Sequence, residues 1–278
     1  MPFAELEGIT ISYQDTGVPV NAAKHGGNYT AIILVHGFRF NSHVFDLFLP
    51  HLSPDYRLIA YDRRGYGQTR TPTASSTGSE HPSDLLALIA HLRATGLVPA
   101  KLTILAWSAG VYHALLATDG VPKDEALPFD VLALYEPASI PVTSDIAEFS
   151  ATFCRIVATY YDAVTGEEIP DRNSLDLMPP ELATLCVELK NEESFIHARS
   201  RLDEELVVRV LGRVPVGLLF GTMSSTQMIT TTKRIGALGV AQSARVAVVA
   251  MEGLNHIGMT DHPDILAESV KEVLGTIP

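Results

Sequence analysis

The chain has 278 residues, of which 46% are hydrophobic and 19% charged, and this composition predicts a globular protein with one large core. Its formal net charge is −12, and the sequence contains no run of basic residues. Both features disfavour binding to nucleic acid or to an anionic membrane. No apolar stretch approaches the roughly 20 residues of a membrane-spanning helix, and residues 1–10 lack the features of a signal peptide. We therefore expect a cytoplasmic protein that binds a small molecule, with a homodimer as one possible assembly.

The two cysteines, Cys154 and Cys186, lie in apolar patterns with helical spacing. They form no CxxC pair, and no histidine stands near them as a second zinc ligand. We expect buried free thiols, and neither a metal nor a cofactor.

Short apolar runs alternate with segments of helical spacing along most of the chain. Two early strands are expected within 3–15, followed by a flexible turn at 18–28. Continuous apolar runs suit strands that are buried on both faces, and their alternation with helices indicates a parallel sheet with right-handed crossovers. Further strands are expected at 29–37, 56–62, 101–107, 129–137, 214–221 and 244–253, and helices at 42–52, 83–96, 109–120, 224–239 and 262–275.

One interval, 139–211, breaks this alternation because it has helical spacing and no convincing strand. Ligands of open α/β sheets bind beyond the carboxyl ends of the strands, so a helical insertion there would cover the binding site. The sequence therefore predicts a core formed by 1–138 and 212–278, and a helical cap at 139–211.

Ser108 lies where the strand expected at 101–107 meets the helix expected at 109–120. Ala106 and Gly110, two residues before and after it, are both small, as a sharp nucleophile elbow requires. Such a turn exposes the serine at the amino end of a helix. By itself, the pattern does not distinguish a nucleophile from a small residue in a turn.

Three further motifs surround this serine in the chain: VHGF at 35–38, YDRRGYGQT at 61–69 and GLNHIG at 253–258. In an acyl-transfer site, the backbone N–H groups of Phe38 and Ala109 would form the oxyanion hole. Together with AWSAG, the motifs resemble the α/β-hydrolase fold superfamily over nearly the whole chain. The resemblance implies an α/β fold with a mostly parallel, eight-stranded sheet, flanking helices and a variable cap after the sixth strand.

The general base should be a histidine after the last strand, where the sequence offers His256 and His262. The resemblance places it at His256, because His262 directly precedes Pro263 at the start of a helix. His36 is interpreted as a brace for the oxyanion turn, and His113 as a packed helix residue.

The acid is the least regular part of the predicted site. Most superfamily members carry it after the seventh strand, but residues 214–227 contain no carboxylate. Glu136 ends the sixth strand, an alternative position seen in some members, and keeps the order nucleophile, acid, base. Two alternatives stay open: Glu136 could cap a turn, and Asp261 or Asp264 could orient the base.

A glutamate on strand six and a final G-x-x-H with H-P-D also resemble fungal lactone hydrolases that degrade zearalenone. Those enzymes hold the lactone with a tryptophan of the cap, whereas the single tryptophan here is beside the serine. Aromatic residues around the site favour an apolar or aromatic substrate, although those of the cap could equally pack on the core. Arg39 could contact a charged group of the substrate or be a surface residue. The candidate substrate-binding residues are Trp107, Phe38, Arg39, Phe153, Tyr160 and Phe195.

These residues predict a carboxylesterase or lactonase that forms an acyl-enzyme on Ser108, with His256 as base and Glu136 as acid. Serine at position 108 disfavours dehalogenases and epoxide hydrolases, which need an aspartate nucleophile. Two alternatives share the fold. A cofactor-free dioxygenase would use the histidine and acid to deprotonate its substrate, and a ligand-binding receptor would turn substrate over slowly.

Overall fold

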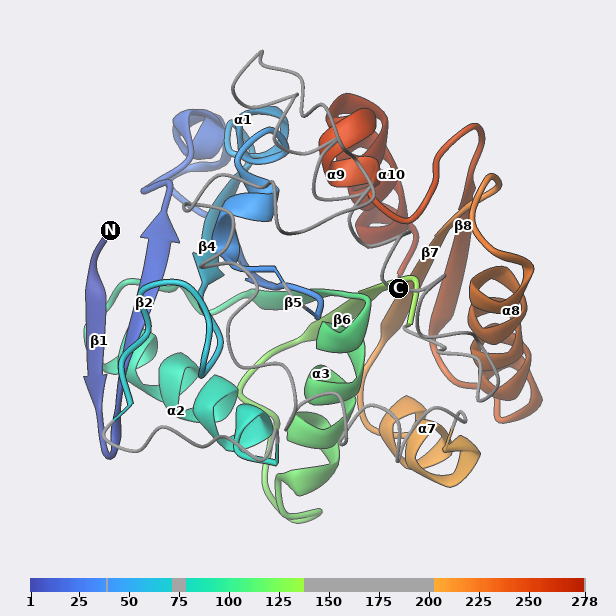
Figure 1. Cartoon of the computed structure of the whole chain (residues 1–278), viewed down its shortest axis with the longest axis horizontal. Helices are drawn as coiled ribbons and strands as arrows, with labels where there is room; N and C mark the ends of the chain where they lie inside the picture. Colours follow the sequence, from blue (N-terminus) through green and yellow to red (C-terminus); the bar gives the residue numbers. More distant parts are fainter. Residues whose placement is uncertain (39, 72–78, 138–202, 278) are drawn as a thin grey trace, which may run out of the picture.

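The computed structural model describes residues 1–38, 40–71, 79–137 and 203–277. Eight strands form one sheet in the order β1-β2-β4-β3-β5-β6-β7-β8 (Figure 1). The strands from β3 to β8 are parallel, and β1 and β2 extend one edge in antiparallel pairing, so the predicted sheet is confirmed. The strands are β1 (Phe3–Leu6), β2 (Ile9–Asp15), β3 (Thr30–Val35), β4 (Tyr56–Tyr61), β5 (Leu102–Trp107), β6 (Val131–Tyr135), β7 (Val216–Gly221) and β8 (Val246–Met251).

The central strands are buried on both faces, which explains their unbroken apolar sequence. Ile33 of β3 lies opposite Ile59 of β4 on one side and Ile104 of β5 on the other. All three side chains are fully buried. Because helices cover both faces, neither face requires the polar residues that a strand exposed on one side would show.

Helices pack on both faces of the sheet, and each face has its own apolar cluster (Figure 1). The burial of apolar surface in these two clusters is the main stabilising contribution to the fold. One face carries α2 (His81–Ala94), α3 (Ala109–Gly120), α7 (Glu204–Leu211) and α8 (Thr226–Ala241), and the other carries α1 (Leu49–Leu52), α9 (Gly258–Asp261) and α10 (Pro263–Thr276).

One prediction of local structure was wrong, and another segment is more ordered than a simple turn. The helix expected at 42–52 is divided into a 3-10 helix, η2 (Ser42–Phe45), and the single turn α1. Pro50 has no backbone N–H to donate to an earlier carbonyl, so a helix cannot continue through it from η2. The turn expected at 18–28 contains a second 3-10 helix, η1 (Val20–His25), which ends at Gly26 with a left-handed φ of 64°.

The described part of the predicted cap is α7, whose first turn is capped by the Asp203 side chain through the backbone N–H of Leu206. Leu206 and Val210 are buried in the same apolar cluster as α3. The rest of the predicted cap, residues 139–202, lies outside the described residues.

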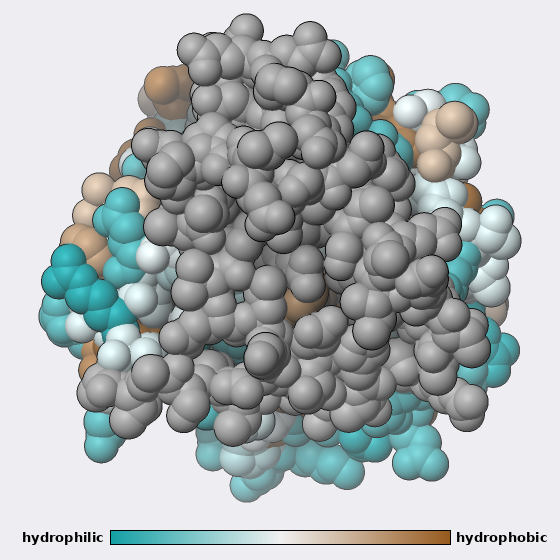
Figure 2. Space-filling view, in the orientation of Figure 1, coloured by the Kyte–Doolittle hydropathy of each residue, from teal (hydrophilic) through white to brown (hydrophobic). Residues whose placement is uncertain are grey.

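Part of the described surface is hydrophilic. The residues along the lower rim of the space-filling view are mostly hydrophilic (Figure 2). Arg234 of α8, for example, forms an exposed ion pair with Glu204 of α7 at 2.8 Å. Within the described ranges, every helix is too short or too polar to cross a lipid bilayer.

Candidate active site

Ser108 occupies a sharp turn between β5 and α3. Its φ of 57° and ψ of −122° are unusual for a residue with a side chain and are held by the packing around the turn. A Cβ atom on Gly110 would lie 2.5 Å from the carbonyl oxygen of Val35, and one on Gly37 would lie 2.9 Å from Ser108 Cβ. Gly110, one of the two small residues that predicted the elbow, is therefore required by close contact with the end of β3, and Gly37 is required by close contact with the serine.

A chain of two hydrogen bonds connects Ser108 to an acid through His256. Ser108 Oγ lies 3.0 Å from His256 Nε2, and His256 Nδ1 lies 2.7 Å from Glu136 Oε2. Because a carboxylate accepts, the imidazole proton belongs on Nδ1, and Nε2 is left to accept from the serine hydroxyl. This geometry is within the hydrogen-bond reach that a general base needs.

Glu136 follows β6, is fully buried and has a φ of 45°. Its Oε1 accepts from the Gly221 backbone N–H at 2.6 Å and from the Ser224 hydroxyl at 2.5 Å. Both carboxyl oxygens therefore have donors, which offsets the cost of burying the group. Gly221 and Ser224 stand at the end of β7, the position from which most of the superfamily supplies the acid itself.

The alternative acids lie in other surroundings. Asp261 Oδ2 accepts from the Asn255 side chain at 2.8 Å, and Asp264 belongs to the first turn of α10. The structure thus brings Glu136, among the three carboxylates considered, into hydrogen-bond contact with His256. Sequence reasoning missed Ser224, whose one signal was a hydroxyl after a strand that lacks its expected carboxylate.

Two aromatic residues hold the loop that carries His256. Trp107, at the end of β5, donates its Nε1–H to the His256 carbonyl oxygen at 2.8 Å, and the two rings lie 5.2 Å apart. Tyr135, at the end of β6, donates its hydroxyl to the Asn255 carbonyl oxygen and accepts from the Gly258 backbone N–H at 3.1 Å. Burial raises the pKa of Tyr135 well above its ordinary value, so the phenol keeps its proton.

The residues expected to form the oxyanion hole lie beside the elbow. Ala109 is the first residue of α3, where backbone N–H groups have no acceptor within the helix, and Phe38 follows Gly37 in the loop that contacts the serine. The two residues therefore belong to separate segments, the loop after β3 and the start of α3, which meet beside the serine. Their role as oxyanion donors stays a prediction.

The predicted substrate-binding residues divide into two groups. Trp107 and Phe38 are 2% and 8% exposed, respectively, and Trp107 supports the His256 loop in addition to any contact with substrate. Their role toward substrate stays a prediction. Arg39, Phe153, Tyr160 and Phe195 lie outside the described residues.

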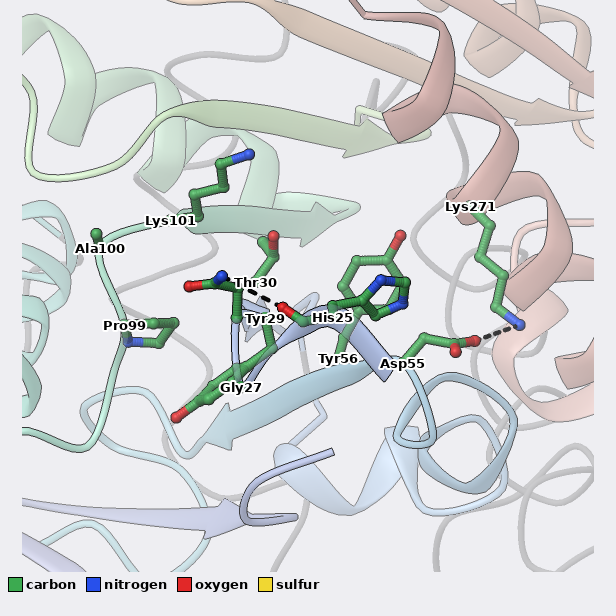
Figure 3. Close-up of a pocket in the computed structure, with 11 residues that line it drawn as sticks. His25, Gly27, Tyr29, Thr30, Asp55, Tyr56, Pro99, Ala100, Lys101 and Lys271 are labelled. Atoms are coloured by element: carbon green, nitrogen blue, oxygen red, sulfur yellow. Dashed lines mark hydrogen bonds and ion pairs between the residues drawn. The ribbon is translucent and has the colours of Figure 1, made fainter. Parts of the chain in front are cut away.

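A groove of about 780 Å³ lies at the end of the sheet where the parallel strands begin, opposite to the end that carries Ser108 (Figure 3). Thr30, Tyr56 and Lys101, at the amino ends of β3, β4 and β5, are among its lining residues. Ser108 follows the carboxyl end of β5, so this groove is remote from the proposed reacting groups.

The model of the alpha/beta hydrolase family matches residues 32–269, which is most of the chain and includes every residue of the hydrogen-bonded chain. The chain belongs to the alpha/beta hydrolase family. Among solved structures, it is similar to an esterase from a Rhodococcus species, with 20% identity, coverage of 99% of this chain and 98% of that one, and a TM-score of 0.69. For an enol-lactonase from Burkholderia xenovorans, identity is 19%, coverage 99% and 100%, and the TM-score 0.64. These similarities show the fold of this alpha/beta hydrolase.

A curated relative matches over a shorter region. It is the 2-heptyl-3-hydroxy-4-quinolone dioxygenase of Rhodococcus erythropolis, 28% identical over 118 residues. The matched region spans 42% of this chain and 42% of that relative. The narrower resemblance to zearalenone-degrading lactone hydrolases is not among these findings and stays a prediction.

Proposed function

We propose that this alpha/beta hydrolase cleaves a carboxylic ester or lactone through an acyl-enzyme on Ser108. The observation that carries the proposal is the continuous hydrogen-bonded chain from Ser108 through His256 to the fully buried Glu136. An activated serine beside an imidazole, which is itself oriented by a carboxylate, is suited to acyl transfer.

In the first step, Ser108 Oγ attacks the substrate carbonyl while His256 Nε2 accepts the hydroxyl proton. Glu136 stabilises the imidazolium that forms, and the N–H groups of Phe38 and Ala109 stabilise the negative charge on the carbonyl oxygen. The bond to the alkoxide leaving group then breaks, and His256 returns the proton to that oxygen. A lactone would open in the same way, with its leaving group still attached.

In the second step, water replaces the alcohol. His256 takes a proton from water, the hydroxide oxygen attacks the acyl-enzyme, and the carboxylic acid leaves as Ser108 regains its proton. We propose an apolar or aromatic acyl group, because Trp107 precedes the serine, Phe38 follows the closely packed Gly37, and the rest of the predicted cap, residues 139–202, is expected to cover the site.

A serine-directed fluorophosphonate followed by intact-mass measurement tests this proposal. One phosphonyl group is expected on the wild-type chain and none on Ser108→Ala, with the modified peptide mapping to Ser108. Ester turnover by the same sample should stop as the adduct forms. A folded wild-type sample that forms no adduct and cleaves none of a panel of aryl esters and aromatic lactones would contradict the proposal.

The partial match to a dioxygenase supports a second candidate activity. In a cofactor-free dioxygenase, the His256–Glu136 pair would take a proton from an acidic substrate hydroxyl, and Ser108 would bind rather than attack. The serine variant separates the two activities. With a hydroxyquinolone as substrate, Ser108→Ala would still consume dioxygen at an oxygen electrode if the protein is a dioxygenase, whereas a serine hydrolase would consume none.

A further inference from the structure

Arg63, two residues after β4, is fully buried, and no step of the proposed mechanism uses it. A buried guanidinium is costly unless acceptors receive its N–H groups, so the positions of those acceptors indicate what the residue holds. Nη2 donates to the Gly37 carbonyl oxygen at 2.9 Å and Nε to the His36 carbonyl oxygen at 3.1 Å. Nη1 lies 3.1 Å from His113 Nε2, which must accept because arginine only donates.

His36 supplies a second donor to the same carbonyl. The backbone N–H of Arg63 donates to His36 Nε2 at 3.0 Å, so the proton of the neutral imidazole lies on Nδ1. His36 Nδ1 is 2.9 Å from the Gly37 carbonyl oxygen and therefore donates to it. The Gly37 oxygen thus accepts from the charged Arg63 side chain and from His36. The backbone N–H of Arg63 determines the His36 tautomer that can donate the second bond.

This carbonyl belongs to the peptide group between Gly37 and Phe38. Peptide groups are planar, and in the trans form, the form of every peptide bond in the described ranges, the N–H points away from the C=O. Two donors on the Gly37 oxygen therefore fix the direction of the Phe38 N–H. They also withdraw electron density from the amide, and hydrogen bonds in series strengthen one another in this way. A charged donor has the larger effect.

We propose that Arg63 is a positioning residue for the oxyanion hole: it orients and polarises the Gly37–Phe38 peptide, so that the Phe38 N–H is a stronger donor to the developing oxyanion. The inference rests on the proposed hydrolase activity and deepens it. Gly37 packs tightly against Ser108, since a Cβ at position 37 would lie 2.9 Å from Ser108 Cβ. The oriented peptide therefore lies directly beside the nucleophile.

Three variants test the effect on the reaction. Arg63→Met removes the charge and the donors, Arg63→Lys keeps the charge without the planar fork, and Arg64→Met is the control. Arg64 is the next residue in the chain, but its guanidinium pairs with Asp84 of α2 at 2.7 and 2.8 Å rather than with the carbonyl oxygens of His36 and Gly37. Loss of one oxyanion donor lowers kcat by about 10²-fold, so we expect about that loss for Arg63→Met with KM changed less than about threefold. Arg63→Lys should be intermediate, and Arg64→Met should match the wild type.

The sequence also permits a direct measurement on the peptide itself. Gly37–Phe38 is the only Gly-Phe pair in the chain, so labelling with carbonyl-¹³C glycine and ¹⁵N phenylalanine gives a single correlated resonance from this peptide. Loss of the Arg63 guanidinium should shift the Gly37 carbonyl carbon upfield, in Arg63→Lys as well as Arg63→Met, and the resonance should stay unchanged in Arg64→Met. In the wild type, an aryl boronic acid that bonds to Ser108 should shift the Phe38 N–H proton downfield.

The outcomes separate this inference from the proposed function. A folded Arg63→Met protein that retains wild-type kcat, or an unchanged Gly37 carbonyl resonance in Arg63→Lys, overturns the inference. If Arg63→Met does not fold, the Arg63→Lys kinetics and resonance decide. If instead the wild type forms no fluorophosphonate adduct, the proposed hydrolase fails, and the resonance of Arg63→Lys still shows whether Arg63 polarises the peptide.

Discussion

Charged groups are held in different ways at the two ends of the parallel strands, called the carboxyl edge and the amino edge of the sheet. At the carboxyl edge, Glu136 and Arg63 are fully buried, and several donors or acceptors surround each of them. At the amino ends of the strands, Lys271 pairs with Asp55 at 3.1 Å (Figure 3). Lys271 also pairs with Glu268 at 2.9 Å, and all three side chains remain partly exposed to water.

This difference in burial indicates which end of the sheet can support a reaction. Water screens the pairs of the amino edge, so they orient little, whereas buried groups interact strongly and keep a single arrangement. Backbone strain follows the same division. The described non-glycine residues with positive φ are Ser108, Glu136 and Ser243, and the first two are the proposed nucleophile and acid. Strained residues of this kind persist where the surrounding structure holds them, which is common at active sites.

Among substitutions at the two edges, removal of the proposed nucleophile should cause the largest loss of ester turnover. Ser108→Ala is expected to lower kcat for an aryl ester by about 10⁶-fold, because the covalent step is lost while the fold is retained. Stopped-time assays with the purified variant, together with a circular dichroism spectrum like that of the wild type, check this. A folded variant that retains ester turnover would show that the serine is not the nucleophile.

Glu136→Gln should have the next largest effect, about 10⁴-fold on kcat, because an amide –NH₂ facing His256 Nδ1–H would favour the wrong tautomer. The matched control is Asp261→Asn, which alters a neighbouring carboxylate that binds Asn255 rather than His256. Steady-state rates for both variants decide between the two acids. Near-normal activity of Glu136→Gln and a large loss in Asp261→Asn would move the acid to the helix start.

Ser224→Ala tests how far the support of the acid matters. The change leaves Glu136 Oε1 with the Gly221 N–H and without the hydroxyl that now lies 2.5 Å away. Because a hydrogen bond to a charged group is worth a few kcal/mol at most, we expect about a 10-fold loss in kcat with KM nearly constant. Ser225→Ala, which removes the α8 cap instead, is the control, and equal losses in both variants would contradict a specific role for Ser224.

The smallest effect is expected at the amino edge. Lys271→Met should leave ester turnover unchanged and lower the free energy of unfolding by about 1 kcal/mol or less, an effect that added salt should reduce. Thermal unfolding at low and high ionic strength measures it. A large loss of activity in this variant would show that the two edges are coupled.

The contribution of the Lys271–Asp55 ion pair to the stability of the fold should fall at low pH. The Asn21 side chain, together with Lys271, lowers the pKa of Asp55. A carboxyl group whose pKa is lower in the folded state stabilises the fold above its unfolded pKa, and this contribution is lost as pH falls through the folded value. The stability difference between wild type and Lys271→Met should therefore narrow in acid, below the ordinary pKa of aspartate.

The sequence by itself determined the strands of the sheet and the elbow at Ser108, because these depend on local patterns of apolar, small and turn-forming residues, and the family resemblance of its motifs pointed to His256. The prediction of one helix at 42–52 was wrong, because it followed the apolar spacing and ignored Pro50, which divides the segment. Glu136 could be named as one of several candidate acids, since its neighbours in sequence do not show which imidazole it reaches.

Only the tertiary structure decided those partners. Glu136 and His256 are 120 residues apart, Ser108 and His256 are 148 apart, and Ser224 comes to Glu136 across 88 residues. The same is true of Arg63, which donates to the carbonyl oxygens of His36 and Gly37, residues 27 and 26 positions away in the chain. The physical reason is that parallel strands bring their carboxyl ends together at one edge of the sheet, so residues far apart in the chain become hydrogen-bond partners.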